Sequence, residues 1–369
     1  MNKLPVRIAI QQRILPAYRV PFFDALAERC ERGLSVFAGN ASPEDGVIEG
    51  SLKTASFQLA VNRQIPGDPL RLMFQTNILD WLNEWQPDIL IAEANPRVLS
   101  TTGAIRWMHH RGRKVIGWGL GAPMSDGALG TIKKSLRSQF LQQFDAIVSY
   151  SQAGLRQYEM AGCRSECVFI APNAVTARPS GKPVERSSKK TGEKPVVLFV
   201  GRLQERKRLD MLFIACAALP EHLKPELWIV GDGPARATFE SQARSIYPSA
   251  RFWGARQGAE LDDLYRKADL FVLPGTGGLA VQQALAFSLP VIVAEADGTQ
   301  SDLVRPQNGW QLSPGDQAAL NATLKEALSD LPRLRKMGAA SFQIVSREVN
   351  LETMLAGFEK AIKYVLAID

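Results

Sequence analysis

Short apolar runs alternate with amphipathic stretches along the first half of the chain. The runs have the length of strands buried on both faces, and the longer stretches repeat apolar residues at helical spacing. Strands are predicted at Val6–Ile10, Leu34–Ala38, Ile89–Ala92, Lys114–Trp118, Ala146–Ser149 and Val168–Ile170. Helices are predicted at Val20–Glu31, Arg71–Trp85, Ser100–Arg111 and Thr131–Gln143. This alternation predicts a parallel sheet covered by helices on both faces.

Residues 176–194 interrupt this pattern with a polar, charged segment that has no periodicity, as is typical of a linker. The alternation then restarts. Strands are predicted at Val196–Val200, Glu226–Val230, Ala250–Trp253, Leu270–Leu273, Pro290–Val293 and Gly309–Leu312. Helices are predicted at Leu209–Ala218, Ala235–Ser245, Ala259–Lys267, Leu279–Phe287 and Asp316–Leu331, followed by a helical pair from Pro332 to Ala367.

This pattern predicts two α/β domains, each built on a Rossmann-like sheet. The first is predicted over residues 1–175 and the second over residues 195–345, with the linker at 176–194 between them. Residues 346–369 are predicted to form a helix that packs back toward the first domain. Ligands of open parallel sheets bind outside the carboxyl ends of the strands. A cleft shared by the two domains is therefore expected to hold the ligand.

Composition narrows the class of protein and the kind of partner. Hydrophobic residues make up 46% of the 369 residues, as in ordinary globular proteins. No apolar run approaches the roughly 18 residues of a membrane span, no signal peptide is recognised, and the four scattered cysteines are expected to be free thiols. A cytoplasmic location is predicted. The net charge of +7 favours anionic partners, and nucleic acid is the weaker choice because RNA-binding and zinc-finger motifs are missing from the sequence.

Two cations follow the first strand of the second half. Val196–Val200 runs into Gly201 and Arg202, and Lys207 lies five residues further on. An arginine fork and a lysine point charge, delivered by one strand end, suit a diphosphate. The alternative interpretation is a solvated surface loop, since other charged residues stand beside them.

A glycine-rich turn, Gly275–Gly278, follows the strand Leu270–Leu273. Glycines let backbone approach a ligand closely, and N–H groups at a helix start attract anions. This composition favours an anion-binding turn over an ordinary connection. A second turn, Gly231–Pro234, does not complete the dinucleotide fingerprint, because Arg236 stands where the third glycine would be. That argues against an NAD-dependent dehydrogenase.

Taken together, these segments resemble the nucleotide-binding domain of family-4 glycosyltransferases with the GT-B fold. They occur in the family's order, as GRLQERK, LWIVGDGP, ARFWGARQGAELDDLYRKADLFVLPG, GGLAVQQALAFSLPVIVAE and NGWQLSPGD. The first half resembles the acceptor domain of that fold more loosely. There YRVPFFDAL and NPRVLSTTGAIRW look like segments of a subgroup that acts on surface polysaccharides.

The resemblance implies a retaining enzyme that moves a sugar from a UDP- or GDP-sugar to a glycan or lipid-linked acceptor, in polysaccharide or lipopolysaccharide biosynthesis. Arg202 and Lys207 would hold the leaving diphosphate, next to Gly201. No Asp-x-Asp occurs in the sequence, so neither a metal nor a cofactor is expected. The remaining donor-binding candidates are backbone groups and one side chain: Phe252, Trp253, Gly254, Thr276, Gly277, Gly278, Leu279 and Gln283.

The chain departs from the family pattern at two places. The family usually has two glutamates around the glycine-rich turn, where this chain has Gly275 and Gln283. Gln283 can still hydrogen-bond a ribose hydroxyl, whereas Gly275 has no side chain to contact the sugar. Sequences with a PG-x-x-GL pattern share this replacement. The family also places a histidine in the cleft, near the position where this chain has Leu120.

Acceptor-side candidates are chosen because they follow predicted strands of the first half. They are Tyr18, Arg19, Glu93, Asn95, Leu120 and Gly121. Two basic runs with apolar residues, Arg106–Lys114 and Lys133–Phe140, suggest docking of the first domain on an anionic membrane surface. Ordinary amphipathic helices are the alternative interpretation of each run.

Two other function classes stay open. A non-catalytic nucleotide-sugar-binding scaffold would bind the nucleotide without turning over the donor. A sugar-nucleotide epimerase also uses two such domains, but it needs acid and base groups that the sequence does not place.

Overall fold

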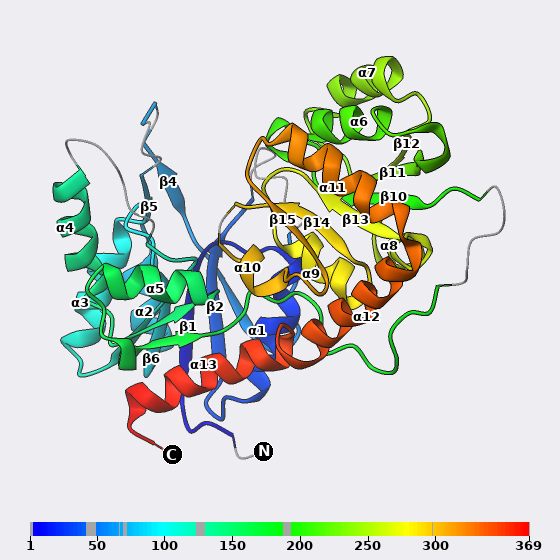
Figure 1. Ribbon diagram of the computed structural model, residues 1–369. Coiled ribbons are helices and arrows are strands. Elements are labelled where there is room, and N and C mark those ends of the chain that lie inside the picture. Colours follow the sequence, from blue (N-terminus) through cyan, green and yellow to red (C-terminus); the bar gives the residue numbers. More distant parts are fainter. Residues whose placement is uncertain are drawn as a thin grey trace. The chain divides into compact units, whose positions relative to one another are not determined.

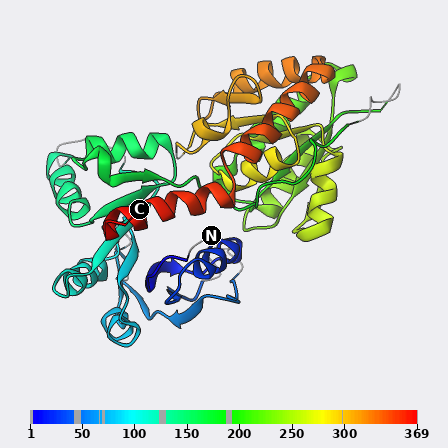
Figure 2. The same cartoon turned by 90° about the horizontal axis from the view of Figure 1, so that it is seen from below.

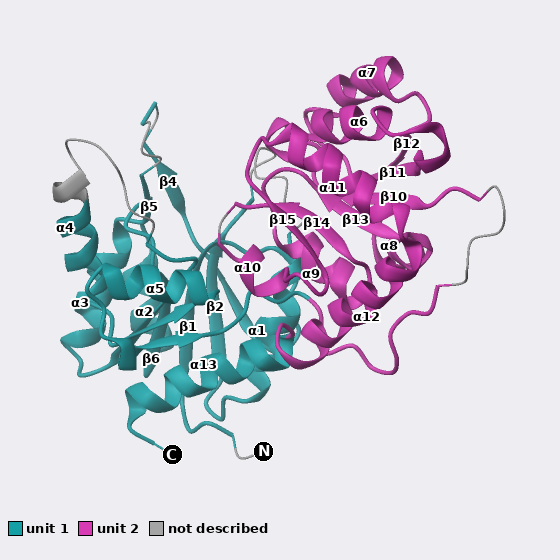
Figure 3. Ribbon diagram, in the orientation of Figure 1, with its two compact units in different colours: residues 1–175, 351–369 teal, residues 176–350 magenta. Residues whose placement is uncertain are grey.

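The computed structural model describes residues 3–41, 49–65, 67–68, 72–122, 130–186, 193–296 and 298–368, without the side chains of 130–133. The chain divides into two compact units (Figure 3). Unit 1 comprises residues 1–175 together with 351–369, and unit 2 comprises residues 176–350. The residues that return to unit 1 therefore begin at Leu351, slightly later than the predicted residue 346.

Unit 1 is built on a parallel sheet of seven strands, in the order β3-β2-β1-β6-β7-β8-β9 (Figure 1). The strands are β1 (Ile8–Ile14), β2 (Leu34–Gly39), β3 (Ser56–Leu59), β6 (Ile89–Glu93), β7 (Lys114–Gly119), β8 (Ala146–Ser149) and β9 (Val168–Ile170). The helices are α1 (Val20–Glu28), α2 (Ile78–Trp85), α3 (Ser100–His109), α4 (Gly130–Leu141), α5 (Gln152–Met160) and α13 (Leu351–Leu366). A separate antiparallel pair joins β4 (Asn62–Gln64) to β5 (Met73–Gln75).

Helices cover both faces of this sheet. On one face α1 and α13 pack over a core that includes Ile10, Ile91, Trp118 and Phe358. On the other face α2, α3 and α4 bury a second core. Helix α13 crosses β7, β8 and β9 and contacts α1 (Figure 2). The last helix of the chain is therefore a structural part of the first unit.

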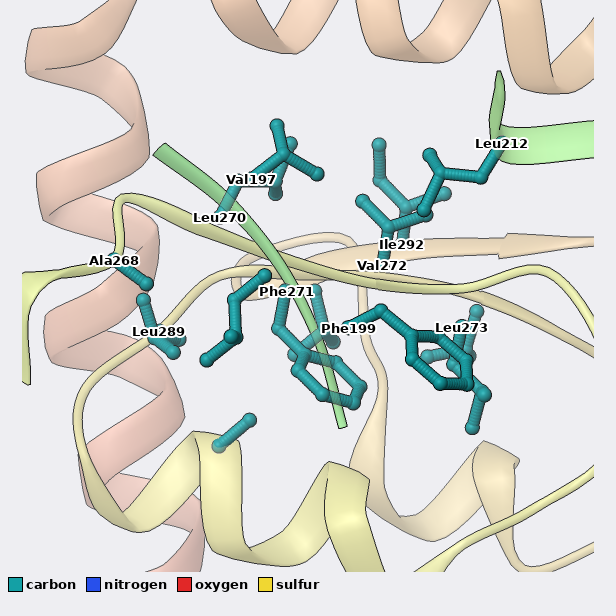
Figure 4. Close-up of a cluster of buried hydrophobic side chains, with 14 of the residues drawn as sticks. Val197, Phe199, Leu212, Ala268, Leu270, Phe271, Val272, Leu273, Leu289 and Ile292 are labelled. Carbon is teal, nitrogen blue, oxygen red and sulfur yellow. The ribbon is translucent and has the colours of Figure 1, made fainter. Parts of the chain in front are cut away.

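Unit 2 repeats the architecture with six parallel strands, in the order β12-β11-β10-β13-β14-β15. The strands are β10 (Val196–Val200), β11 (Glu226–Val230), β12 (Arg251–Gly254), β13 (Leu270–Leu273), β14 (Val291–Ala294) and β15 (Gly309–Leu312). The helices are α6 (Leu209–Ala217), α7 (Arg236–Ile246), α8 (Gly258–Lys267), α9 (Leu279–Ala286), α10 (Gln300–Leu303), α11 (Gln317–Ser329) and α12 (Leu331–Arg347). Figure 4 shows part of its apolar core, with Phe199 of β10 and Phe271 of β13 among the labelled side chains.

The main strands were predictable, but the segment between β2 and α2 was not. The helix predicted at Arg71–Trp85 begins only at Ile78, and β5 occupies Met73–Gln75. In β5, Met73 and Gln75 are buried while Phe74 is exposed, which is the alternation of a half-buried strand. Strand β3 is exposed at the sheet edge and lacks the apolar run by which the other strands were recognised. Helix α5 was also missed.

The polar segment predicted as a linker is partly packed on unit 2. The Arg186 guanidinium donates to the carbonyls of Tyr265, Ala268, Phe287 and Ser288, at 2.5–3.2 Å. These carbonyls lie at the ends of α8 and α9, where helices leave acceptors unsatisfied. Burial lowers the pKa of Arg186 to about 10. Residues up to Arg186 therefore belong structurally to the second unit.

Candidate functional site

The loops at the carboxyl edge of the unit 2 sheet carry most of the predicted donor-binding residues, and the first of these loops touch one another. Gly201 follows β10, Gly231 follows β11 and Gly254 ends β12. Gly231 has φ +133°, and a Cβ there would lie 2.0 Å from the Gly201 carbonyl oxygen. The Gly231 N–H donates to the Gly254 carbonyl at 2.9 Å. Glycine is thus required where the first two loops touch.

Lys207 grips the glycine-rich turn. Its Nζ donates to the Thr276 carbonyl at 2.5 Å, and only 8% of the residue is exposed. Arg206 binds the two other polar groups of Thr276: its carbonyl accepts from the Thr276 N–H at 3.1 Å, and its Nη1 donates to the Thr276 hydroxyl at 2.7 Å. The predicted cation Lys207 and the predicted turn therefore form one contact cluster.

Gly275 stands where the resembled family usually has a glutamate. Close packing against backbone explains why this chain has glycine there. A Cβ on Gly275 would lie 2.1 Å from the Arg206 carbonyl oxygen and 2.7 Å from the Lys207 Cα. Both contacts are to backbone, so a side chain here would displace the loop that carries Lys207. The position of the loop that carries Lys207 therefore requires glycine at 275 and leaves no room for a glutamate side chain.

The other donor-side candidates occupy distinct places. Arg202 is half-buried directly after Gly201. Leu279 opens α9, whose N-cap residue Gly278 makes no side-chain cap hydrogen bond. N–H groups at such a helix start can bind an anion. Gln283 is half-buried in α9, while the neighbouring Gln282 is fully buried and donates to Thr176 and Val349.

Phe252 and Trp253 direct their rings into the protein rather than outward. Phe252 packs against Phe213 with ring centroids 6.4 Å apart, and Trp253 packs against Trp228 at 5.3 Å. Both residues are partly buried, and the predicted contact of their backbone with a ligand stays a prediction.

Two residues beside the turn were missed by sequence reasoning. Gln300, fully buried in α10, donates to the Gly277 carbonyl at 2.8 Å. Thr299 is 6% exposed, and its hydroxyl would lie 2.9 Å from a Cβ on Gly278. They belong to no motif, and only the three-dimensional fold brings their segment to the turn.

In unit 1, a cavity of about 400 Å³ lies at the carboxyl ends of β6 and β7. Glu93, Asn95, Leu120 and Gly121, all predicted acceptor-side residues, line it. Glu93 accepts from the Arg13 N–H at 2.8 Å. Burial raises the pKa of its carboxyl above the ordinary value, and the contact with Arg13 opposes this only in part.

Tyr18 and Arg19 are not among the residues that line this cavity. Arg19 is 4% exposed and donates to the Asn173 side chain. Its guanidinium lies over the rings of Trp118 and Tyr150, 5.2 and 5.5 Å from their centroids. Both rings line the cavity, so Arg19 packs against two of its lining residues without lining it itself. Tyr18 is 41% exposed.

In the two basic runs proposed to meet a membrane the aromatic side chains are packed, whereas the described charged residues are exposed or half-buried. Trp107 is 9% exposed and Phe140 is 7% exposed, both in the unit 1 core, whereas Leu136 is 61% exposed. His109 pairs with Asp145 at 3.1 Å. Among the described residues, no helix has the length and apolarity to cross a membrane, and no cluster of three potential metal ligands occurs.

Sequence comparison finds the likeness to known proteins mainly in unit 2. Residues 182–343 match the family model described as "Glycosyl transferases group 1". Unit 2 is therefore similar to a group 1 glycosyltransferase domain. A GDP-mannose-dependent alpha-mannosyltransferase of Mycobacterium tuberculosis is 42% identical over 124 residues, which cover 33% of this chain and 30% of that protein. The sulfoquinovosyl transferase SQD2 of Arabidopsis thaliana is 33% identical over 155 residues, 40% of this chain and 29% of that protein. The chain thus spans about a third or less of these curated relatives.

Solved structures extend the likeness from the group 1 domain to the whole chain. The lipopolysaccharide outer core galactosyltransferase WaaB superposes with a TM-score of 0.72 at 18% identity, covering 97% of this chain and 99% of that one. Anabaena Alr3699/HepE, solved with UDP and glucose, gives a TM-score of 0.70 at 16% identity, with 97% and 99% coverage. At such low identity these matches establish the fold, which is GT-B, as predicted.

Proposed function

We propose that the protein is a retaining, metal-independent glycosyltransferase that uses a UDP- or GDP-sugar. The observation that carries the proposal is the contact of Lys207 with the glycine-rich turn, at the carboxyl edge of a sheet in the part of the chain that matches the group 1 family. One relative is named for its use of GDP-mannose and one similar structure holds UDP, so either base is compatible with the proposal.

The proposed chemistry is departure of the nucleoside diphosphate and attack of the acceptor on the same face of the sugar. Arg202 and Lys207 would stabilise the charge that develops on the leaving diphosphate, together with the N–H groups at the start of α9. Lysine has three donors, so Lys207 can keep its bond to Thr276 while it contacts a phosphate oxygen. An oxygen of the departing diphosphate would take the acceptor proton, so no protein base is required.

The acceptor is proposed to be a glycan or lipid-linked sugar that binds in the unit 1 cavity. Glu93 and Asn95 offer hydrogen-bonding groups there, and the ring of Trp118 offers an apolar surface. Assignment to lipopolysaccharide or other surface polysaccharide synthesis is supported by the name of the similar galactosyltransferase WaaB. Binding to an anionic membrane surface is also proposed, and the exposed Leu136 with its basic neighbours on α4 is the feature that supports it.

The test is nucleotide binding and donor turnover in R202A and K207A. Each variant is expected to lower kcat at least about 100-fold, the scale for losing one charge-stabilising donor. Calorimetry with UDP and GDP identifies the base, and release of UDP or GDP from a panel of nucleotide sugars measures turnover. R244A, which removes an exposed cation on α7, is the matched control and should behave as wild type.

Three outcomes separate the alternatives. Near-normal turnover in both variants would rule out the assigned site. Nucleotide binding by the wild type without turnover of any donor would favour the scaffold. Formation of an epimeric nucleotide sugar without release of the nucleotide would favour the epimerase.

A further inference from the structure

The glycine-rich turn is held from two sides. The Thr276 carbonyl accepts from Lys207, and the next carbonyl, that of Gly277, accepts from Gln300 at 2.8 Å. The two donors come from different parts of the chain, one from the loop after β10 and the other from α10. Two consecutive peptide groups of the turn are therefore fixed by side chains.

Fixing a carbonyl also fixes the direction of an N–H group. In a planar trans peptide the N–H points opposite to the C=O. Gln300 therefore sets the direction of the Gly278 N–H, and Lys207 sets that of the Gly277 N–H. These two groups directly precede α9, whose first turn has no side-chain cap.

This backbone would not hold its orientation by itself. Gly277 has φ +153° and Gly278 also lacks a side chain, so both peptide groups can rotate at low cost. Gln300 is fully buried, which gives its amide few other positions. Thr299 adds a buried hydroxyl close to Gly278.

We propose that Gln300 is a positioning residue for the donor diphosphate, which it serves by holding the Gly277 carbonyl so that the Gly278 N–H faces the phosphates. This inference rests on the proposed function. It adds a residue outside the glycine-rich motif, acting on the ligand only through the backbone.

The test compares wild type with Q300M and Q300E, using UDP-glucose and GDP-mannose as probes because their diphosphate diesters do not titrate in the range used. Q300M keeps the size of the side chain and removes the donor, so its affinity is expected to fall about 10-fold at every pH, the equivalent of one hydrogen bond of about 1.4 kcal/mol. At about pH 8 the affinity of Q300E should fall at least as far as that of Q300M, because a carboxylate cannot donate a hydrogen bond.

At about pH 5 the affinities of the two variants for the nucleotide sugars should differ. A buried glutamate protonates readily, and its carboxyl O–H can then donate to the Gly277 carbonyl. The affinity of Q300E, expressed relative to wild type at the same pH, should therefore recover several-fold, whereas that of Q300M should not. Charged groups on the described segments around the turn include Arg202, Glu205, Arg206, Lys207, Glu295 and Asp302, and they are common to all three proteins.

The inference would be overturned if Q300E and Q300M lost the same affinity at every pH. It would also be overturned if both variants bound as tightly as wild type. Failure of the wild type to bind any nucleotide sugar would instead count against the proposed function. Thermal unfolding checks that each variant is folded. If Q300M is not, Q300N replaces it: its amide is one methylene too short to reach Gly277, so it should bind about 10-fold more weakly, and wild-type affinity would refute the inference.

Discussion

Gly275 and Gln300 show how differently single residues of the site can be recognised. Gly275 stood out in the sequence because it occupies a place where a family pattern has an acid, and the backbone contact with Arg206 explains it. Gln300 has no local signal at all, since its partner Gly277 is 23 positions away in the sequence. Residues at strand ends are predictable from periodicity, whereas residues that support them from a neighbouring loop are not.

Glu93 gives a residue-scale prediction for stability against pH. Burial raises the pKa of its carboxyl in the folded protein, so the neutral form is favoured there. The resulting stability is fully present below the ordinary pKa of the unfolded chain and is lost as pH rises through the folded pKa. E93Q keeps the acceptor for the Arg13 N–H but cannot ionise. Its melting temperature should therefore exceed that of wild type at pH 8, by a margin that shrinks toward pH 4.

The control for this prediction is E31Q, because Glu31 is an exposed glutamate of the same unit. Its melting temperature should differ from that of wild type by the same small amount at every pH. A pH-independent difference for E93Q as well would contradict the assigned burial of the Glu93 carboxyl.

Among the elements, strands with several apolar residues were predicted well, including the edge strands β9 and β15, whereas β3, β4 and β5 were not. Strands β8, β9, β10, β11, β13 and β15 have the predicted limits. Most of them are apolar runs buried in the sheet, which leave little choice of structure. Exposed β3 and the small β4–β5 pair lack such runs, and their pairing depends on neighbours distant in sequence. The polar segment before β10 was predicted to be a linker because an arginine in a polar stretch suggests a solvated charge. Only the structure shows the four carbonyl partners of Arg186.

Arg186 is expected to stabilise the ends of α8 and α9. R186A leaves four carbonyls at those ends without their donor, and should lower the free energy of unfolding of unit 2 by about 3 kcal/mol. R186K should restore only part of the loss, because lysine lacks the planar fork. Denaturant unfolding followed by tryptophan fluorescence measures both. K182A, an exposed neighbour in the same segment, should change little, and an equally small effect of R186A would refute this role.

At the scale of the whole molecule, the chain leaves unit 1 after Val175 and returns to it at Leu351. The repetition of apolar strands and amphipathic helices made the two-domain fold predictable, because each half reads as a complete open sheet. Sequence pattern alone could not show how deeply the last helix is built into unit 1, since α13 is simply amphipathic. The contacts of Phe358 with Phe22 and Trp118, at 4.8 and 5.0 Å between ring centroids, establish that.

F358A should therefore weaken unit 1 and spare unit 2. Removing this fully buried ring is expected to cost about 3–5 kcal/mol, the usual range for Phe to Ala in a core. Hydrogen exchange should show faster exchange in residues 1–175, with residues 176–350 and nucleotide affinity unchanged. The exposed neighbour Lys360 provides the control variant K360A. Equal loss of protection in both units would contradict the division.

The place of α13 has a consequence for the order in which the protein is made. Domains usually fold as they leave the ribosome, the first one earliest. Here the residues that complete the apolar core of unit 1 are synthesised only after all of unit 2. Until then the nascent chain carries an uncovered patch around Phe22 and Trp118. Unit 1 is begun before unit 2 and completed after it, so the uncovered patch needs protection from aggregation while unit 2 is being made.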